Sequence, residues 1–101
     1  MILTIVIFFL IGVFAFNGIP HLVKGITGQV HMTPFAQKTS PEVNVLWGIL
    51  NFIIAWALWY FVKTDGNNVI QWIAFFIGGA VISVNLANFW KNPDAKLPWH
   101  K

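Results

Sequence analysis

The chain has 101 residues, of which 57% are hydrophobic and only 9% are charged. A soluble domain of this length needs a larger polar surface, so the composition excludes a water-soluble globule and favours a protein embedded in a membrane. The net charge of +3 comes from six lysines and three acids, which are too few and too dispersed for a nucleic-acid surface. Because the chain has no cysteine, disulfides, thiolate nucleophiles and cysteine-ligated metal sites are excluded.

Three uncharged apolar stretches divide the chain: residues 2–19, 43–62 and 69–90. About 20 helical residues cover the ~30 Å hydrocarbon core of a bilayer, so each stretch can cross it as a helix. The first stretch is not preceded by a positive residue or followed by an A-x-A-like cleavage site, so we expect a retained span rather than a secretory signal. The sequence therefore predicts an all-α membrane protein, with three transmembrane helices in a single transmembrane domain, residues 1–101.

Capping and turn residues mark two borders of these spans. Ser40, Pro41 and Glu42 place a capping hydroxyl, a proline and an acid at the start of the second helix. The run at residues 63–68 is short and rich in turn-forming residues. Helices 2 and 3 are therefore expected to form an antiparallel hairpin.

The end of the first helix is ambiguous, because Pro20 removes a backbone donor and crowds the preceding turn. The helix either stops near Asn17 or kinks there and continues to Gly25 at the interface, and we favour the kink. A long interfacial loop, residues 20–42, follows the first span. Its part from 26 to 40 is apolar enough to lie on the membrane surface or between helices.

The positions of the lysines predict the orientation. The loop 20–42 and the tail 91–101 share one side and hold five of the six lysines, while the other side holds Lys63 and the terminal amine. The positive-inside rule therefore places the loop and the C-terminus in the cytoplasm and the N-terminus outside. Lysines near the surface favour anionic lipid headgroups by about 1 kcal/mol each, so the lipid bilayer and its anionic lipids are expected partners.

Amide and small side chains form one face on each of the last two spans, at helical spacing. Since an unsatisfied polar group in lipid is costly, these faces should turn toward each other or toward a shared third element. Amides bonded across helices contribute about 0.6–2 kcal/mol each, which is our main interpretation, and a path for a solute or ion is the alternative. The faces are Asn44, Gly48, Asn51 and Ala55 on the second span, and Gln71, Ala74, Gly78 and Asn85 on the third.

A second face of the third span carries Gly79, Ser83 and Ala87, a small-x-x-x-small series. Such a series lets two helix backbones approach closely. Its partner is either the first helix of the same chain or a helix of another protomer. Since three helices do not easily bury two separate small faces, we predict a homo-oligomer or a larger membrane complex.

The first half of the chain contains three motifs: NGIPHLVKGITG at residues 17–28, TPFA at 33–36 and SPEVNVLWG at 40–48. Together they resemble an uncharacterised family of small bacterial membrane proteins that share an NGxPH segment after a first span and a VNVLWG segment opening the second. The resemblance implies a multi-pass protein of the bacterial plasma (inner) membrane and supplies no mechanism. By position it singles out Asn17, Pro20, His21, Gly25, Gly28, Thr33, Pro34, Asn44, Trp47 and Gly48.

The NGxPH segment places His21 at the membrane interface, just past the first span. Lys24 could supply charge and the backbone from Gly25 to Gly28 a nest of donors, so that the histidine gates or binds an anion. In the structural alternative, His21 caps a kinked helix and satisfies loop carbonyls. The candidate functional cluster is Asn17, Pro20, His21, Lys24, Gly25, Gly28 and His31.

Catalytic and metal motifs are missing from the sequence. The spacing of His21, His31 and His100 matches no compact ligand motif, carboxylates are scarce, and no Ser-His-Asp constellation is visible. We therefore expect no enzyme activity, no cofactor and no metal. The favoured function is that of a structural or accessory membrane protein acting through helix–helix contacts, and the alternative is an oligomeric channel or small-solute transporter, including a holin-like variant.

Overall fold

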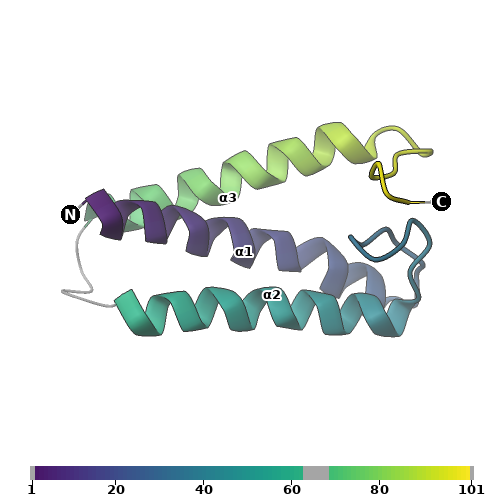
Figure 1. Cartoon of the computed structure of the whole chain (residues 1–101), viewed down its shortest axis with the longest axis horizontal. Coiled ribbons are helices and arrows are strands. Elements are labelled where there is room, and N and C mark those ends of the chain that lie inside the picture. Colours follow the sequence, from purple (N-terminus) through teal and green to yellow (C-terminus); the bar gives the residue numbers. More distant parts are fainter. Residues whose placement is uncertain (1, 63–68, 101) are drawn as a thin grey trace.

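The computed structural model describes residues 2–62 and 69–100 of the chain. They form three helices, α1 (Ile2–Ile26), α2 (Pro41–Val62) and α3 (Val69–Trp90), shown in Figure 1. All three are long and apolar enough to cross a membrane, which confirms the predicted helical class and is compatible with a small multi-pass membrane protein. The turn predicted at residues 63–68 lies outside the described residues.

Helix α1 continues through Pro20 to Ile26, as in the second of the two alternatives for its end. It ends in a Schellman motif, in which the amide of Gly28 bonds the carbonyl of Gly25 at 3.0 Å and the next amide bonds the carbonyl of Lys24 at 2.9 Å. Gly28 has a φ of 76°, a conformation that glycine adopts at little cost. The segment between the first two helices is therefore shorter than the expected 20–42.

The predicted start of α2 agrees with the structure. The helix begins at Pro41, and the hydroxyl oxygen of Ser40 accepts a bond from the amide of Val43 at 3.2 Å. Pro41 occupies the first helical position, where its missing N–H costs no hydrogen bond. Ser40 is thus the N-cap.

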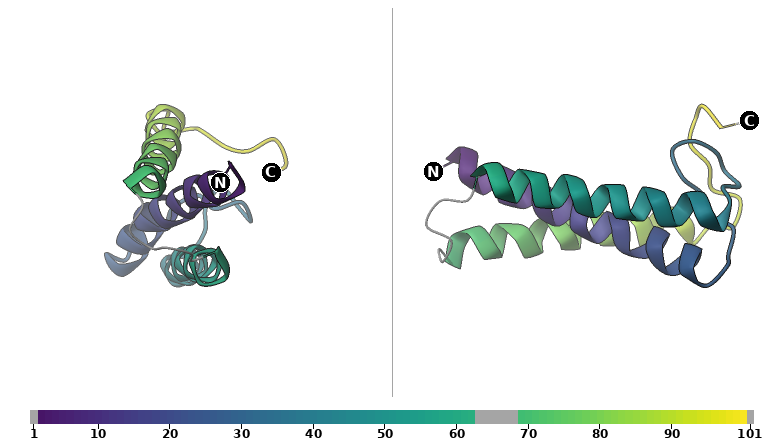
Figure 2. Two further views of the ribbon diagram at one scale, coloured as in Figure 1. Left: turned by 90° about the vertical axis from the view of Figure 1, so that its left-hand side faces the viewer. Right: turned by 90° about the horizontal axis from the view of Figure 1, so that it is seen from below.

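Helix α1 lies between the other two helices, as the views in Figures 1 and 2 show. Within the described residues, α1 packs against both α2 and α3, whereas α2 and α3 make no direct helix–helix contact. The expected hairpin is thus not a packed pair of helices. The polar faces of α2 and α3 turn toward α1, which is the shared third element.

Glycines allow the backbones to approach closely on both sides of α1. A Cβ atom on Gly18 of α1 would lie 2.8 Å from the carbonyl oxygen of Gly48 on α2. On the other side, Gly12 of α1 faces the backbone of α3, and a Cβ atom on Gly79 of α3 would lie 2.5 Å from the ring of Phe16. Any larger side chain at these positions would push α1 away from its neighbours.

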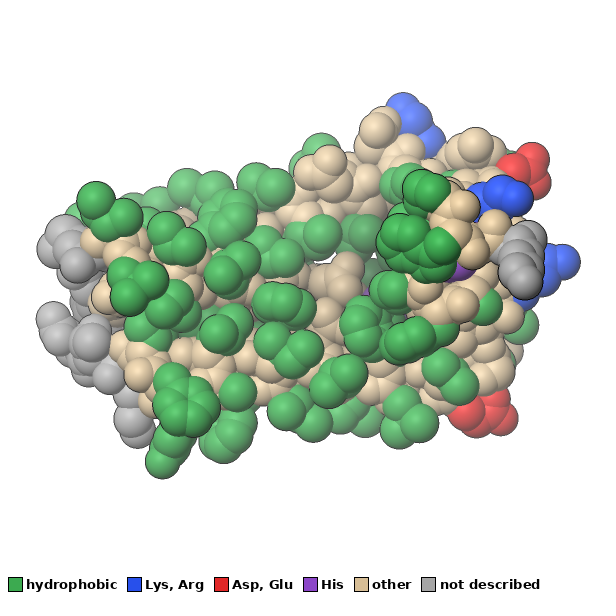
Figure 3. Space-filling model, viewed as in Figure 1, with side chains coloured by type: hydrophobic (Ala, Val, Ile, Leu, Met, Phe, Trp, Pro, Cys, Tyr) green, Lys and Arg blue, Asp and Glu red, His purple; other side chains and the backbone are tan. Residues whose placement is uncertain are grey.

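The outer faces of the helices are apolar and exposed (Figure 3). Phe61 on α2 and Val84 on α3 are 86% and 68% exposed, respectively. Ser83 and Ala87 are exposed as well, so the small-residue series of α3 contacts α1 at Gly79 but is not covered by the chain farther along. Such a surface suits lipid rather than water.

We predict that Gly48→Val destabilises the fold by about 1–3 kcal/mol, because the new side chain meets the backbone of α1. A Cβ atom on Gly48 would lie 2.9 Å from both the carbonyl oxygen of Gly18 and the amide nitrogen of Leu22. The thermal midpoint of the purified protein in detergent measures the effect. Ala80→Val, at an exposed position of α3, is the control and should leave the midpoint unchanged; equal midpoints for the two variants would contradict the packing.

Candidate functional site

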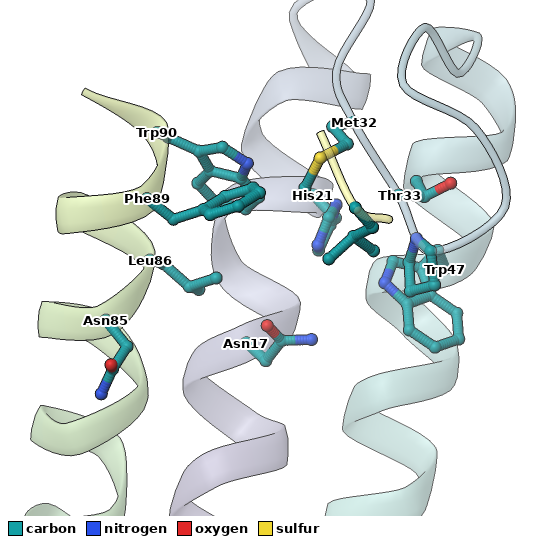
Figure 4. Close-up of a pocket in the computed structure, with 11 residues that line it drawn as sticks. Asn17, His21, Met32, Thr33, Trp47, Asn85, Leu86, Phe89 and Trp90 are labelled. Atoms are coloured by element: carbon teal, nitrogen blue, oxygen red, sulfur yellow. The ribbon is translucent and has the colours of Figure 1, made fainter. Parts of the chain in front are cut away.

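A cavity of about 320 Å³ lies at the loop end of the bundle (Figure 4). Asn17 and His21 of α1 line it, with Trp47 of α2 on one side and Asn85 and Trp90 of α3 on the other. The remaining lining is mostly apolar and comes from α3, the loop and the C-terminal tail. Because α2 and α3 do not contact each other, the space between them stays open here.

The loop that covers this cavity is held in a fixed shape. His31 and Thr39 pair across it through two backbone hydrogen bonds of 3.1 and 3.2 Å. The hydroxyls of Thr33 and Thr39 bond each other at 2.7 Å, and the Thr33 hydroxyl also accepts the amide of Phe35 at 3.1 Å. Both threonines are buried, so this part of the loop is packed against the rest of the protein.

The tail after α3 folds back onto the loop. The indole of Trp99 donates to the carbonyl of Pro34 at 2.6 Å, and a ring nitrogen of His100 bonds the carbonyl of Thr33 at 2.9 Å. The other ring nitrogen of His100 accepts the amide of Leu97, so the nitrogen facing Thr33 carries the proton. Tail and loop together form the roof of the cavity.

Asn44 connects the roof to the helices. Its side chain is fully buried, and its amide nitrogen bonds the carbonyls of His31, Thr39 and Ser40 at 2.9, 3.2 and 3.1 Å. Its amide oxygen lies 2.9 Å from Nδ1 of His21. Since that oxygen can only accept, Nδ1 of His21 donates, and in a neutral ring Nε2 keeps a lone pair.

A second amide pair lies deeper in the same α1–α2 seam. Asn17 donates to the side-chain oxygen of Asn51 at 3.0 Å, and Asn51, which is fully buried, donates to the carbonyl of Trp47 at 2.8 Å. On α3, Gln71 is buried, whereas Asn85 is exposed and donates to the carbonyl of its own helix one turn back at 2.7 Å. The amides predicted on the last two spans thus have different surroundings, and of those four Asn85 alone lines the cavity.

Two buried indole nitrogens that belong to residues lining the cavity, Nε1 of Trp47 and Nε1 of Trp90, have no hydrogen-bond partner among the described residues. The same holds for Nε2 of His31 in the adjoining loop. An indole N–H can only donate. Figure 4 shows His21 between the two indoles, on the helix that lies behind them. A molecule in this space would therefore meet two unused donors and the lone pair of His21.

The rings of His21, His31 and Trp90 form a cluster where α1, the loop and α3 meet. The His31 ring centre lies 5.4 Å from that of His21 and 4.2 Å from that of Trp90. Burial, and to a smaller extent the neighbouring His21 and Lys24, lower the pKa of His31 from 6.5 to about 4. His31 is therefore neutral at pH 7.

The predicted anion nest is not formed. The amides of Gly28 and the residue after it are bonded to helix carbonyls, and a Cβ atom on Gly28 would meet nothing within 4 Å. Gly25 packs against the carbonyl of Pro41 instead. The alternative of His21 satisfying loop carbonyls is also wrong, because Asn44 bonds those carbonyls and His21 bonds Asn44.

The remaining residues of the predicted cluster lie close to the cavity. Pro20 and Lys24 line a neighbouring cavity on its loop side, and the Lys24 ammonium group donates to the side chain of Gln29 at 3.0 Å. In residues 2–62 and 69–100, no group of three or more metal-ligating side chains is found. His100, the third histidine, uses both ring nitrogens in hydrogen bonds.

Sequence reasoning missed the role of Trp90 and of the tail. Trp90 is not among the candidate site residues of the sequence analysis, yet its ring packs against both His21 and His31. Neither contact follows a local pattern in the sequence that could have indicated it. No protein-family model, no curated protein and no solved structure matches this chain.

We predict that Asn44→Leu lowers the local stability of the loop by about 2–4 kcal/mol, because several buried bonds are lost together. Amide hydrogen exchange at His31 and Thr39 reports this opening. Asn85→Leu removes an amide with only a local backbone bond and serves as the control. Unchanged exchange at both amides in the Asn44 variant would show that this side chain does not hold the loop.

We also predict that the stability contribution of neutral His31 is lost as the pH falls from 6.5 toward 4. In this window the unfolded chain takes up a proton at the ordinary pKa of 6.5, whereas the folded chain does so only near 4. Because the ring is only half-buried, we expect a loss of about 1–2 kcal/mol. The thermal midpoint of wild type should fall more steeply over this range than that of His31→Gln, and parallel pH profiles would contradict the assignment.

Proposed function

We propose that this chain is a small multi-pass membrane protein that binds one amphipathic molecule in the cavity at the loop end. The observation that carries the proposal is the cavity itself, which has mostly apolar walls and a few polar groups without intramolecular partners. Pockets for small molecules have this character, and about 320 Å³ lies within their usual range of ~300–1,000 Å³.

The polar groups specify the chemistry of the head of such a molecule. The indoles of Trp47 and Trp90 offer donors, and Nε2 of His21 offers an acceptor when the ring is neutral. A head that carries oxygen acceptors for the indoles and an O–H or N–H donor for His21 would satisfy these groups. The apolar part of the molecule would lie against Leu86 and Phe89 of α3. Binding of this kind would relieve the cost of unpaired buried donors.

The proposed location follows the lysine distribution. We place the loop end and the C-terminus in the cytoplasm, the N-terminus outside, and the protein in the bacterial plasma membrane, where anionic lipids are its nearest partners. Figure 3 is consistent with this arrangement, since the lysine side chains it colours gather at the loop end. The cavity would then lie at the level of the cytoplasmic headgroups.

A structural or accessory role through helix–helix contacts in an oligomer is the second candidate. It is favoured by the exposed Ser83 and Ala87, which line an apolar groove with Phe16 and Ile19 of α1 that a helix of another protomer could cover. The channel or transporter alternative has less support, because the side-chain amides of Asn44 and Asn51 donate to backbone carbonyls inside the bundle.

We expect wild type, extracted from its membrane in mild detergent, to carry one amphipathic molecule per chain in native mass spectrometry. Leu86→Trp fills the cavity and should abolish retention. Val84→Trp places the same side chain on the exposed face of the same helix and should retain the molecule. Equal retention by both variants, or a bare chain in every sample, would refute the proposed function, and the same spectra report the oligomeric state.

A further inference from the structure

A second cavity, of about 400 Å³, adjoins the first on its loop side. Lys24 of α1 and His31 and Lys38 of the loop line it, together with part of the tail. The two cavities meet at Met32 and Trp90, which line both. A mostly apolar space and a more polar one therefore share a wall at the end of the bundle.

The charge in the second cavity is positive. Two lysines line it, and none of the described residues that line it is acidic. The buried Nε2 of His31 has no hydrogen-bond partner, and neither has the buried indole N–H of Trp90. The cavity thus offers two ammonium groups and an unused indole donor, without a carboxylate to balance them.

Stabilisation of a helix end does not explain why both Lys24 and Lys38 line this cavity. Lys24 lies in the last turn of α1, where a cation offsets the negative end of the helix dipole. Lys38 belongs to no helix, is exposed, and still lines the same cavity. Both side chains thus line one cavity, although only Lys24 lies at a helix end.

An apolar groove leads from this cavity toward the lipid-facing surface. It has a volume of about 270 Å³ and runs between α1 and α3, where Ile19, Ser83 and Ala87 line it. Pro20 and Trp90 line both the groove and the basic cavity. Trp90 therefore lies at the junction of one basic and two apolar spaces.

We propose that the basic cavity binds the phosphate group of a membrane lipid, while the rest of the lipid's polar head reaches Trp47 and His21 and its acyl part occupies the apolar remainder of the first cavity. This inference rests on the proposed function and names the chemical class of its ligand. Lysine binds phosphate as a point charge, and the attraction is strengthened where one side of the site is walled by indole rather than water. A lipid phosphate joins the two properties that the adjoining cavities show separately, a charged oxygen-rich head and an apolar body.

The test uses the full chain in micelles of a maltoside detergent, which carries no phosphate and so does not compete for the site. The added probes are phosphatidic acid with six-carbon chains, diacylglycerol with the same chains, and inorganic phosphate. The indole Nε1–H resonance of Trp90 reports binding. The variants are Lys38→Gln, the double variant Lys24→Gln with Lys38→Gln, and as a charge-matched control Lys91→Gln with Lys96→Gln, two exposed tail lysines outside the cavity.

We expect wild type and the tail control to bind phosphatidic acid about 10- to 30-fold more tightly than diacylglycerol, as two nearby lysines would provide. Lys38→Gln should lose part of this preference and the double variant all of it. Equal binding of both lipids by wild type would overturn the phosphate assignment and leave the proposed function standing. Failure of both lipids to shift the Trp90 resonance would overturn both. Inorganic phosphate binding as tightly as phosphatidic acid would overturn the lipid as its source.

Discussion

The close approach of α1 to both of its neighbours determines the rest of the structure. Gly18 and Gly48 bring α1 and α2 into backbone contact, and Gly12 and Gly79 do the same between α1 and α3. With α1 held between them, α2 and α3 cannot pack on each other. The space left between their loop-side ends is the cavity, and the loop and tail close it from above.

The two seams of α1 differ in chemistry. Toward α2 the contacts are polar, with Asn17 bonded to Asn51 and His21 bonded to Asn44. Toward α3 they are aromatic and small, including an edge-on pair of Phe16 and Phe75 with ring centres 5.8 Å apart. The polar seam fixes the register of α1 and α2, because amides in hydrocarbon must keep their partners. The α1–α3 seam opens into the cavity near the loop.

The bounds of α2 and α3 and the polar face of α2 could be predicted from the sequence. The end of α1 was left between two alternatives, and the partners of the polar faces could not be predicted. Hydropathy and the Ser40 cap set the helices, and helical spacing placed Asn44 and Asn51 on one face. Their partners on α1 were missed because a short turn suggested that α2 packs on α3, whereas the glycines of α1 give it a closer fit to both. The docking of Trp99 on the loop has no periodicity, so nothing local in the sequence indicates it.

The central claim is that α1 is the common partner of both other helices, and solid-state NMR of the full chain in lipid bilayers tests it most directly. Through-space correlations between labelled side chains should connect Asn17 with Asn51 and His21 with Asn44, at the short distances of 3.0 and 2.9 Å seen here. Correlations of Asn44 or Asn51 with the side chain of Asn85 on α3, in place of those with α1, would contradict the account.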